Sequence, residues 1–247
     1  MNALLRAVGV ALLAACAFAP AAHANVLIAG TRVVLPAKDG EVTVRMTNES
    51  ERPALVQAWI DRGDAKSTPD TVDTPFLVTP PMFRMEPGRD QSLRILYTRE
   101  PLPADRESLF WLNVLDVPPK PSDLEATGAN YLQLAVRSRL KLFFRPQGLS
   151  GDPLKAPGEL TFRAASGDGG TVIVVSNPTP YHVTINDIAV DAGGKPRTVE
   201  TGMVAPRSEL RLKVDGLTSA PAAGAAVRYT AINDYGSPVS FTGVLAP

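Results

Sequence analysis

Hydrophobic and polar residues alternate with a period of two along most of the chain, which is the spacing of a strand with one buried face. Val42, Val44 and Met46 alternate with polar residues, and the same alternation recurs at residues 56–60 and 92–97. Turns rich in Gly, Pro and Asp separate these runs. We therefore expect half-buried antiparallel strands. No stretch has the length and the 3.6-residue periodicity of a helix.

A change of composition after residue 146 divides the chain into two units. Residues 147–158 contain three glycines and two prolines, which is typical of a domain boundary. Many short strands at regular spacing predict sandwiches, so we expect an all-β protein with two domains, residues 25–146 and 147–247. The longer strand candidates 107–116 and 131–145 close the first unit. The strand candidates of the second unit are Leu160–Arg163, Thr171–Ser176, Tyr181–Asp191, Leu210–Val214, Ala226–Ile232 and Val239–Leu245.

Residues 1–24 have the pattern of a secretory signal peptide. An apolar stretch follows Arg6 and ends in the small-x-small sequence Ala22-His23-Ala24, so the mature protein should begin at Asn25. Leu13-Ala14-Ala15-Cys16 also resembles a bacterial lipobox, and a lipid tether at Cys16 is the alternative. No other apolar run approaches the roughly 18 residues that span a bilayer, so we expect an exported protein with no membrane span.

Composition argues against several classes of function. Lys plus Arg number 25 and Asp plus Glu number 25, so the chain lacks the basic field of a nucleic-acid binder. Cys16 is the only cysteine, and His23 and His182 are the only histidines, which excludes a Cys/His metal cluster within the chain. His182 alternates with Val183 and Ile185, a pattern that predicts an exposed histidine on a sheet face rather than a catalytic base.

Two other segments could suggest chemistry but do not support it. Gly167-Asp168-Gly169-Gly170 lacks the lysine and the following helix of a phosphate-binding loop, so we expect a hairpin turn and no ATP site. Asp105 and Glu107 are close in sequence, but paired catalytic carboxylates are defined by their separation across a cleft. A solvated or salt-bridged role is the default for both, and we predict that the protein is not an enzyme and uses no cofactor.

Four motifs occur in order across nearly the whole mature chain. The motifs are Asp105-Arg106-Glu107-Ser108-Leu109-Phe110-Trp111-Leu112-Asn113 with Val117-Pro118-Pro119, Leu132-Gln133-Leu134 running to Leu140-Lys141-Leu142-Phe143-Phe144-Arg145-Pro146, Asn177-Pro178-Thr179-Pro180-Tyr181, and Ile232-Asn233-Asp234-Tyr235-Gly236. Together they resemble the PapD-like family of periplasmic pilus (fimbrial) assembly chaperones of Gram-negative bacteria. The resemblance implies two immunoglobulin-like sandwiches, arranged as an L or boomerang, with a subunit-binding cleft between them.

The resemblance also implies that residues 131–144 are a strand lent to another protein. A pilus subunit is similar to an immunoglobulin domain without its last strand, which leaves an apolar groove and open edges. Leu132, Leu134, Val136 and Leu140 share one face of the segment and would enter that groove. The alternation alone allows a second explanation, in which this face packs inside the chain's own sandwich.

Two polar sets follow from the same resemblance. Arg32 and Lys141 match the cations that bind the terminal carboxylate of the subunit, where charge-assisted hydrogen bonds would fix the register of pairing. Glu107, Arg145 and Asp234 match an ionic cluster across the domain junction, which would set the angle between the domains.

These inferences predict a periplasmic chaperone that binds pilus subunits and delivers them to an outer-membrane usher. A structural pilus subunit or adhesin is the alternative. Residues 120–130 are longer than a tight hairpin, yet the mature chain has no cysteine pair of the kind associated with the long-loop subgroup. The subgroup, the client subunits and self-association through the donor-strand edge are therefore left open.

Overall fold

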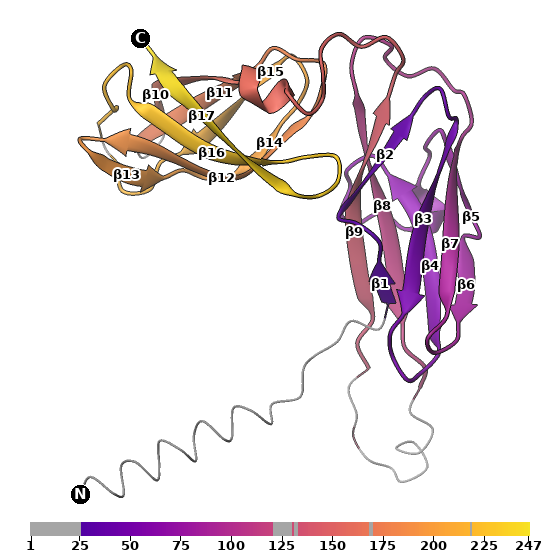
Figure 1. The fold of residues 1–247 in the computed structure, drawn as a ribbon. Helices are drawn as coiled ribbons and strands as arrows, with labels where there is room; N and C mark the ends of the chain where they lie inside the picture. Colours follow the sequence, from indigo (N-terminus) through magenta and orange to yellow (C-terminus); the bar gives the residue numbers. More distant parts are fainter. Residues whose placement is uncertain (1–25, 121–129, 131–132, 168–169, 218) are drawn as a thin grey trace, which may run out of the picture.

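The alternating segments fold into strands, and the strands build two β-sandwich domains that lie across each other as the arms of an L (Figure 1). This confirms the predicted all-β architecture. The computed structural model describes residues 26–120, 130, 133–167, 170–217 and 219–247. The predicted signal peptide, with Cys16, and the first residues of the predicted donor strand, Tyr131 and Leu132, lie outside the described residues.

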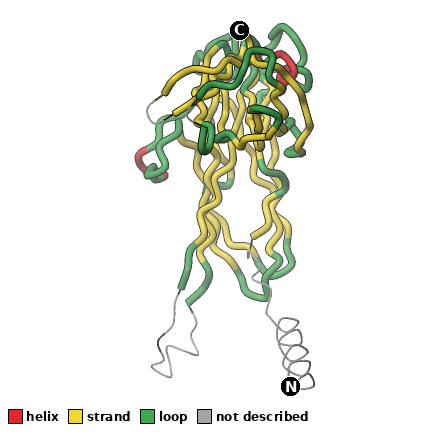
Figure 2. The backbone as a smooth tube through the Cα atoms, turned by 90° about the vertical axis from the view of Figure 1, so that its left-hand side faces the viewer, coloured by secondary structure: helices red, strands yellow, loops and turns green. Residues whose placement is uncertain are grey.

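Two sheets form the N-terminal domain, and Figure 2 shows them as two layers of strands. The described strands of this domain are β1 (Val26–Ile28), β2 (Arg32–Pro36), β3 (Glu41–Asn48), β4 (Ala54–Asp61), β5 (Phe76–Thr79), β6 (Met82–Met85), β7 (Asp90–Tyr97), β8 (Ser108–Val117) and β9 (Val136–Arg145). The strand order is β1-β3-β7-β5 in one sheet and β2-β9-β8-β4-β6 in the other. The pairing of β2 with β9 is parallel, whereas β9 pairs with β8 antiparallel.

The core of the N-terminal domain lies between these two sheets. Val44 and Met46 of β3, together with Ile95 of β7, are buried from one side, and Val56 and Leu112 are buried from the other. The alternate residues of β3 and β7 are more exposed, so the predicted period of two is confirmed for these strands. In β4 it holds only at the start of the strand, because Ala58, Trp59, Ile60 and Asp61 are all buried.

The C-terminal domain is a second sandwich with its own core. Its described strands are β10 (Thr161–Gly167), β11 (Gly170–Asn177), β12 (Val183–Ala192), β13 (Lys195–Thr198), β14 (Gly202–Val204), β15 (Ser208–Lys213), β16 (Ala226–Ile232) and β17 (Pro238–Ala246). They follow the order β13-β12-β16-β17-β10-β11-β15, with β14 beside β12. Gly167 pairs with Gly170, which confirms the predicted hairpin there. Phe162, Ile173, Ile188 and Val227 lie in the core of this domain.

A buried asparagine closes a turn in each domain. Asn48 at the end of β3 donates to the Met85 carbonyl oxygen at 3.1 Å, and its own side-chain oxygen accepts from the Ser50 amide. Asn177 at the end of β11 donates to the Tyr181 carbonyl oxygen at 2.7 Å and accepts from the Thr179 amide and hydroxyl. Buried amide groups need such partners, so the Asn177 motif is explained by the turn that it stabilises.

Helical structure is minor in the part of the chain that the structure describes. It consists of two 3-10 turns, η1 (Pro69–Thr71) and η2 (Ala156–Glu159). Among these residues no helix is long and apolar enough to cross a membrane. Strand β9 ends at Arg145, and the buried residues of the second core begin at Ala156 of η2.

Candidate functional site

Strand β9 has two halves with different neighbours. It pairs with β8 along its whole length, from Val136 opposite Asp116 to Phe144 opposite Ser108. Strand β2 joins its other edge only from Lys141 onward, because β1 pairs with β3 in the other sheet. We call residues 136–140 the free half and residues 141–145 the paired half. Within the described residues, the free half thus has one unpaired backbone edge, which is a template for another strand.

A hollow of about 380 Å³ lies beside this edge, between β1 and the free half of β9. Apolar side chains of β1 line one side and β9 lines the other. The lining residues are Val26, Leu27, Ile28, Gly30, Thr31, Ser138, Arg139 and Leu140.

The predicted donor residues divide between the surface and the core. Leu134 is 64% exposed and Val136 is 52% exposed, so both are available to a partner. Leu140 is only 6% exposed and packs in the N-terminal core, because at its position β9 lies over the opposing sheet. We therefore remove Leu140 from the donor set. Leu132 lies outside the described residues.

Arg32 and Lys141 lie side by side where the two halves of β9 meet. They are register partners in the β2–β9 pair. The Lys141 Nζ donates to the Thr184 hydroxyl at 3.1 Å, and the Arg32 Nη1 donates to the Ile232 carbonyl oxygen at 3.0 Å. Both cations therefore reach from the N-terminal domain to the C-terminal domain, and they lie in the cleft between the domains.

The charges of this pair are poorly compensated. Among the described residues neither cation forms an ion pair with a carboxylate, and the buried Nε of Arg32 has no hydrogen-bond partner. Burial lowers the pKa of Lys141, and the neighbouring charge of Arg32 lowers it further. Burial likewise lowers the pKa of Arg32, although Asp234 partly offsets the effect. Two half-buried cations with an orphaned N–H favour an anionic occupant.

Glu107, Arg145 and Asp234 meet at the domain junction. Arg145 Nε lies 2.7 Å from the Glu107 carboxylate, and its two terminal nitrogens lie 2.7 and 3.0 Å from the Asp234 carboxylate. Burial alone would lower the pKa of Arg145, but Asp234 and Glu107 together raise it. Glu107 directly precedes β8, Arg145 ends β9 and Asp234 lies in the loop after β16, so the cluster joins the two domains directly.

His182 is a residue whose place the sequence prediction missed. Its side chain is 6% exposed, not exposed on a sheet face as predicted, because it lies in the junction. Its Nδ1 is 3.3 Å from the Glu107 carboxylate, its backbone N–H donates to the same group at 2.8 Å, and its ring lies against Phe143. Residues 107 and 182 are 75 positions apart, so no local pattern could have revealed this contact.

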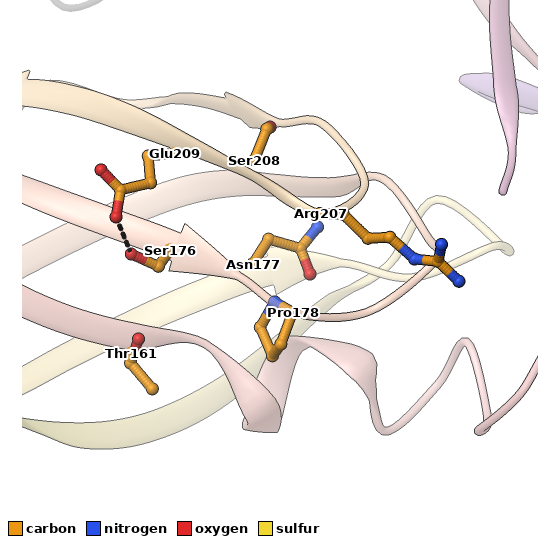
Figure 3. Close-up of a pocket in the computed structure, with 7 residues that line it drawn as sticks. All are labelled: Thr161, Ser176, Asn177, Pro178, Arg207, Ser208 and Glu209. Carbon is orange, nitrogen blue, oxygen red and sulfur yellow. Dashed lines mark hydrogen bonds between the residues drawn. The ribbon is translucent and has the colours of Figure 1, made fainter.

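A second hollow, of about 350 Å³, lies on the C-terminal domain (Figure 3). Its polar groups already have partners within the chain: Ser176 donates to Glu209 at 2.7 Å, and Arg207 donates to Asp105 at 2.8 Å. The salt-bridged role predicted for Asp105 is thus confirmed. This hollow differs from the Arg32–Lys141 site, where cations lack anionic partners. Its lining residues are Thr161, Ser176, Asn177, Pro178, Arg207, Ser208 and Glu209.

Comparison with known families decides what kind of protein has this geometry. Residues 25–150 match the N-terminal domain of the pili and flagellar-assembly chaperone PapD, and residues 155–242 match the C-terminal domain of the pili assembly chaperone PapD. The chain belongs to the PapD family of pilus assembly chaperones. Proteins of this family work in the periplasm and act as chaperones rather than as enzymes.

Relatives and solved structures agree with this assignment. The chain is 47% identical to the chaperone protein FimB/FhaD of Bordetella pertussis over 97% of its length and 95% of the relative. It is 41% identical to the probable fimbrial chaperone YadV of Escherichia coli K12, over 90% of this chain and 91% of that one. The crystal structure of YadV chaperone superposes with a TM-score of 0.77, at 38% identity, covering 90% of this chaperone and all of that chain. The SafB chaperone of Salmonella enterica, solved in complex with SafA pilin, gives 0.73 at 30% identity, over 92% of this chain and 99% of that one.

Proposed function

We propose that this chaperone binds an exported pilus subunit in the periplasm by donor-strand complementation, catalyses no reaction, and delivers the subunit to an outer-membrane usher. The observation that carries the proposal is the unpaired edge of the free half of β9, which lies next to two uncompensated cations. An extended chain can add to such an edge through main-chain hydrogen bonds, while side-chain pockets supply specificity. The SafB relative, whose solved structure includes a pilin, supports a subunit as the partner.

The apolar side chains of the free edge would supply part of the binding energy. Leu134 and Val136 are largely exposed in the chaperone alone. Burial of such a side chain contributes about 1.5–3 kcal/mol, so the two together contribute roughly 3–6 kcal/mol before the cost of ordering. Leu132, which precedes them on the same face, would extend this contact. Backbone pairing adds a modest net energy and aligns the strands.

Arg32 and Lys141 would set the register of the added strand. Because both lie at the boundary between the free and paired halves, a carboxylate bound there fixes where the partner chain ends relative to β9. A terminal carboxylate can accept hydrogen bonds from both cations. A slip of one residue would turn each donor side chain to the wrong face, so an anchored end protects the alignment.

The junction would orient the two domains around the cleft. We propose that the division falls between residues 146 and 147, one residue after Arg145, and that Glu107, Arg145 and Asp234 hold the angle between the domains. Their partial burial makes them more than an exposed ion pair, since removal of one partner leaves an uncompensated charge. Release at the usher needs no nucleotide in this scheme, because the final strand from the next subunit should fit the groove better than β9.

Co-expression tests the proposal. Residues 25–247 would be produced with a pilus subunit that lacks its own N-terminal extension, and size-exclusion chromatography would measure the complex. We expect a one-to-one complex with the native chaperone and none with the Leu134→Asp/Val136→Asp variant, because two charges would enter an apolar groove.

Leu77→Asp is the matched control, since Leu77 is 62% exposed but lies on β5 in the other sheet. It should retain the complex. A donor-strand variant that still captures the subunit would contradict the proposal. Polymers of this chain alone would instead indicate a structural pilus subunit.

A further inference from the structure

Two buried polar side chains lie at the centre of the cleft-facing side of the β9 sheet. Asn113 of β8 is 0% exposed and Asp61 of β4 is 1% exposed. The Asn113 amide donates to Asp61 Oδ2 at 2.7 Å. Asp61 also accepts from the Gly63 N–H at 2.6 Å and from the Ser67 hydroxyl at 3.1 Å. The pair therefore presents hydrogen-bond acceptor oxygens in a fixed position, on the same sheet face from which Lys141 reaches the C-terminal domain.

Arg139, from the free half of β9, binds to this pair. Its Nη2 donates to both oxygens of Asp61 at 2.9 Å, and its Nε donates to Asn113 Oδ1 at 3.1 Å. Its guanidinium lies over the Trp111 ring at 4.8 Å. Several directed contacts on one planar group hold a long side chain in a single position.

Arg137, two residues earlier, is held in a similar way, with its Nη2 at 3.8 Å from Asp61 Oδ2. Its Nε and Nη2 donate to Asn113 Oδ1 at 3.0 and 2.7 Å. Its other contacts are with the loop after β4, where Nη1 donates to the Ala65 carbonyl oxygen at 2.9 Å and Nη2 to the Ser67 hydroxyl at 3.1 Å. The guanidinium lies over the Trp59 ring at 4.6 Å.

These contacts compensate for the missing neighbour of the free half. An edge strand with one partner is prone to fraying and to slippage of its register. Because successive side chains point to opposite faces, fixing Arg137 and Arg139 on the cleft face keeps Val136 and Ser138 on the other. We infer that Arg137 and Arg139 are positioning residues for subunit capture, which hold the free half of β9 extended and in register by binding to Asn113 and Asp61.

The electrostatic state of Asp61 agrees with this role. Burial would raise its pKa, but hydrogen bonds from Asn113, Gly63, Arg139 and Ser67 together lower the pKa below its ordinary value. The carboxylate therefore stays ionised at neutral pH and holds Arg139 as a charged partner.

The test combines local exchange with binding kinetics, and its binding arm rests on the proposed function. Arg137→Met removes the guanidinium but keeps a long unbranched side chain. We expect amide hydrogen exchange at the β8-paired amides of residues 136–140 to become about tenfold faster in the free chaperone, with residues 141–145 unchanged. The association rate constant for a subunit lacking its N-terminal extension should fall about tenfold, with little change in dissociation, because the bound subunit then holds the edge.

Two further variants define the comparison. Arg137→Lys keeps the positive charge but lacks the planar guanidinium group. Its amide exchange rates and its association rate constant should therefore lie between those of the native protein and those of Arg137→Met. Arg163→Met removes an exposed arginine paired with Glu209 on the other domain, and both readouts should match the native protein. If Arg137→Met does not fold, Arg137→Lys carries the same test, with a smaller effect of the same kind expected.

The possible outcomes separate the two proposals. Native exchange and association rates in a folded variant would overturn the positioning role, and so would uniformly faster exchange throughout the N-terminal domain, which indicates an ordinary structural contact. If the native chaperone captures no subunit, the proposed function fails, whereas the exchange measurement on the free protein still tests whether the arginines order the strand.

Discussion

The two halves of β9 differ in burial and in their open edges, because the free half has one neighbouring strand and the paired half has two. In the paired half, Leu142 and Phe144 are buried between the sheets, and β2 covers the second edge. In the free half, Val136 is more than half exposed and the second edge is open. The difference originates in another segment, where Gly30 at φ +96° lets the chain pass from β1 in one sheet to β2 in the other. A sheet switch of a few residues thus leaves a binding edge on a strand that is otherwise core.

The largest expected effect is a charge reversal at the boundary of the two halves. Lys141→Glu would place a carboxylate beside Arg32 and repel the terminal carboxylate of a subunit. We expect subunit affinity to fall by about 100-fold or more, measured by titration calorimetry, while circular dichroism stays native. Lys195→Glu makes the same charge change on exposed β13 and should bind normally. Unchanged affinity of Lys141→Glu would show that the anchor is elsewhere.

Truncation in each half should separate folding from binding. Leu142→Ala, in the paired half, removes a core side chain and should lower the free energy of unfolding by about 2–5 kcal/mol. Val136→Ala removes an exposed one and should change it by less than about 0.5 kcal/mol while weakening subunit binding. Urea unfolding followed by circular dichroism measures the first effect, and calorimetric titration measures the second. If both truncations lowered the free energy of unfolding equally, Val136 would be packed like a core residue and would not be available to a partner.

A smaller effect is expected from pH. Because the pKa of Lys141 is lowered in the free chaperone and a bound carboxylate would raise it, binding should take up a fraction of a proton between the two pKa values. Affinity should therefore fall as pH rises through that window, which begins below the ordinary lysine value of about 10.4. Calorimetry over a pH series below about 10.4, in buffers of different ionisation enthalpy, detects the proton. Lys141→Arg should abolish the uptake, since arginine stays charged.

The smallest effect is expected from an ion pair at the junction but away from β9. Arg207 and Asp105 join the domains at the surface, where solvent screens the attraction. Arg207→Ala should leave both the unfolding midpoint and subunit affinity unchanged within error. A clear loss of affinity would show that the outer contact, and not only the Arg145 cluster, orients the cleft.

The sequence predicted the long strands because their alternation is a local property. Short strands such as β5, β6 and β13 were missed, since four residues are too few to establish a period. The same limitation separates Val136 from Leu140: both lie on one face of β9, and only the position of the second sheet decides which is buried. The hydrogen bonds of Arg137 and Arg139 depend on strand register, which no alternation pattern contains. Resemblance to a family supplied the Arg145 cluster but not His182.

Gly236 lets the two domains approach each other closely at their joint. It follows Asp234 at the tip of the β16–β17 hairpin, and a Cβ at this position would lie 2.6 Å from the Thr31 hydroxyl oxygen of the other domain. Only glycine therefore fits at this close approach, and a side chain here would push the domains apart at the same tip where Asp234 binds Arg145. Close packing at Gly236 and the ion pair of Asp234 with Arg145 act on the same joint, so the spacing that a subunit would meet is already set in the free chaperone.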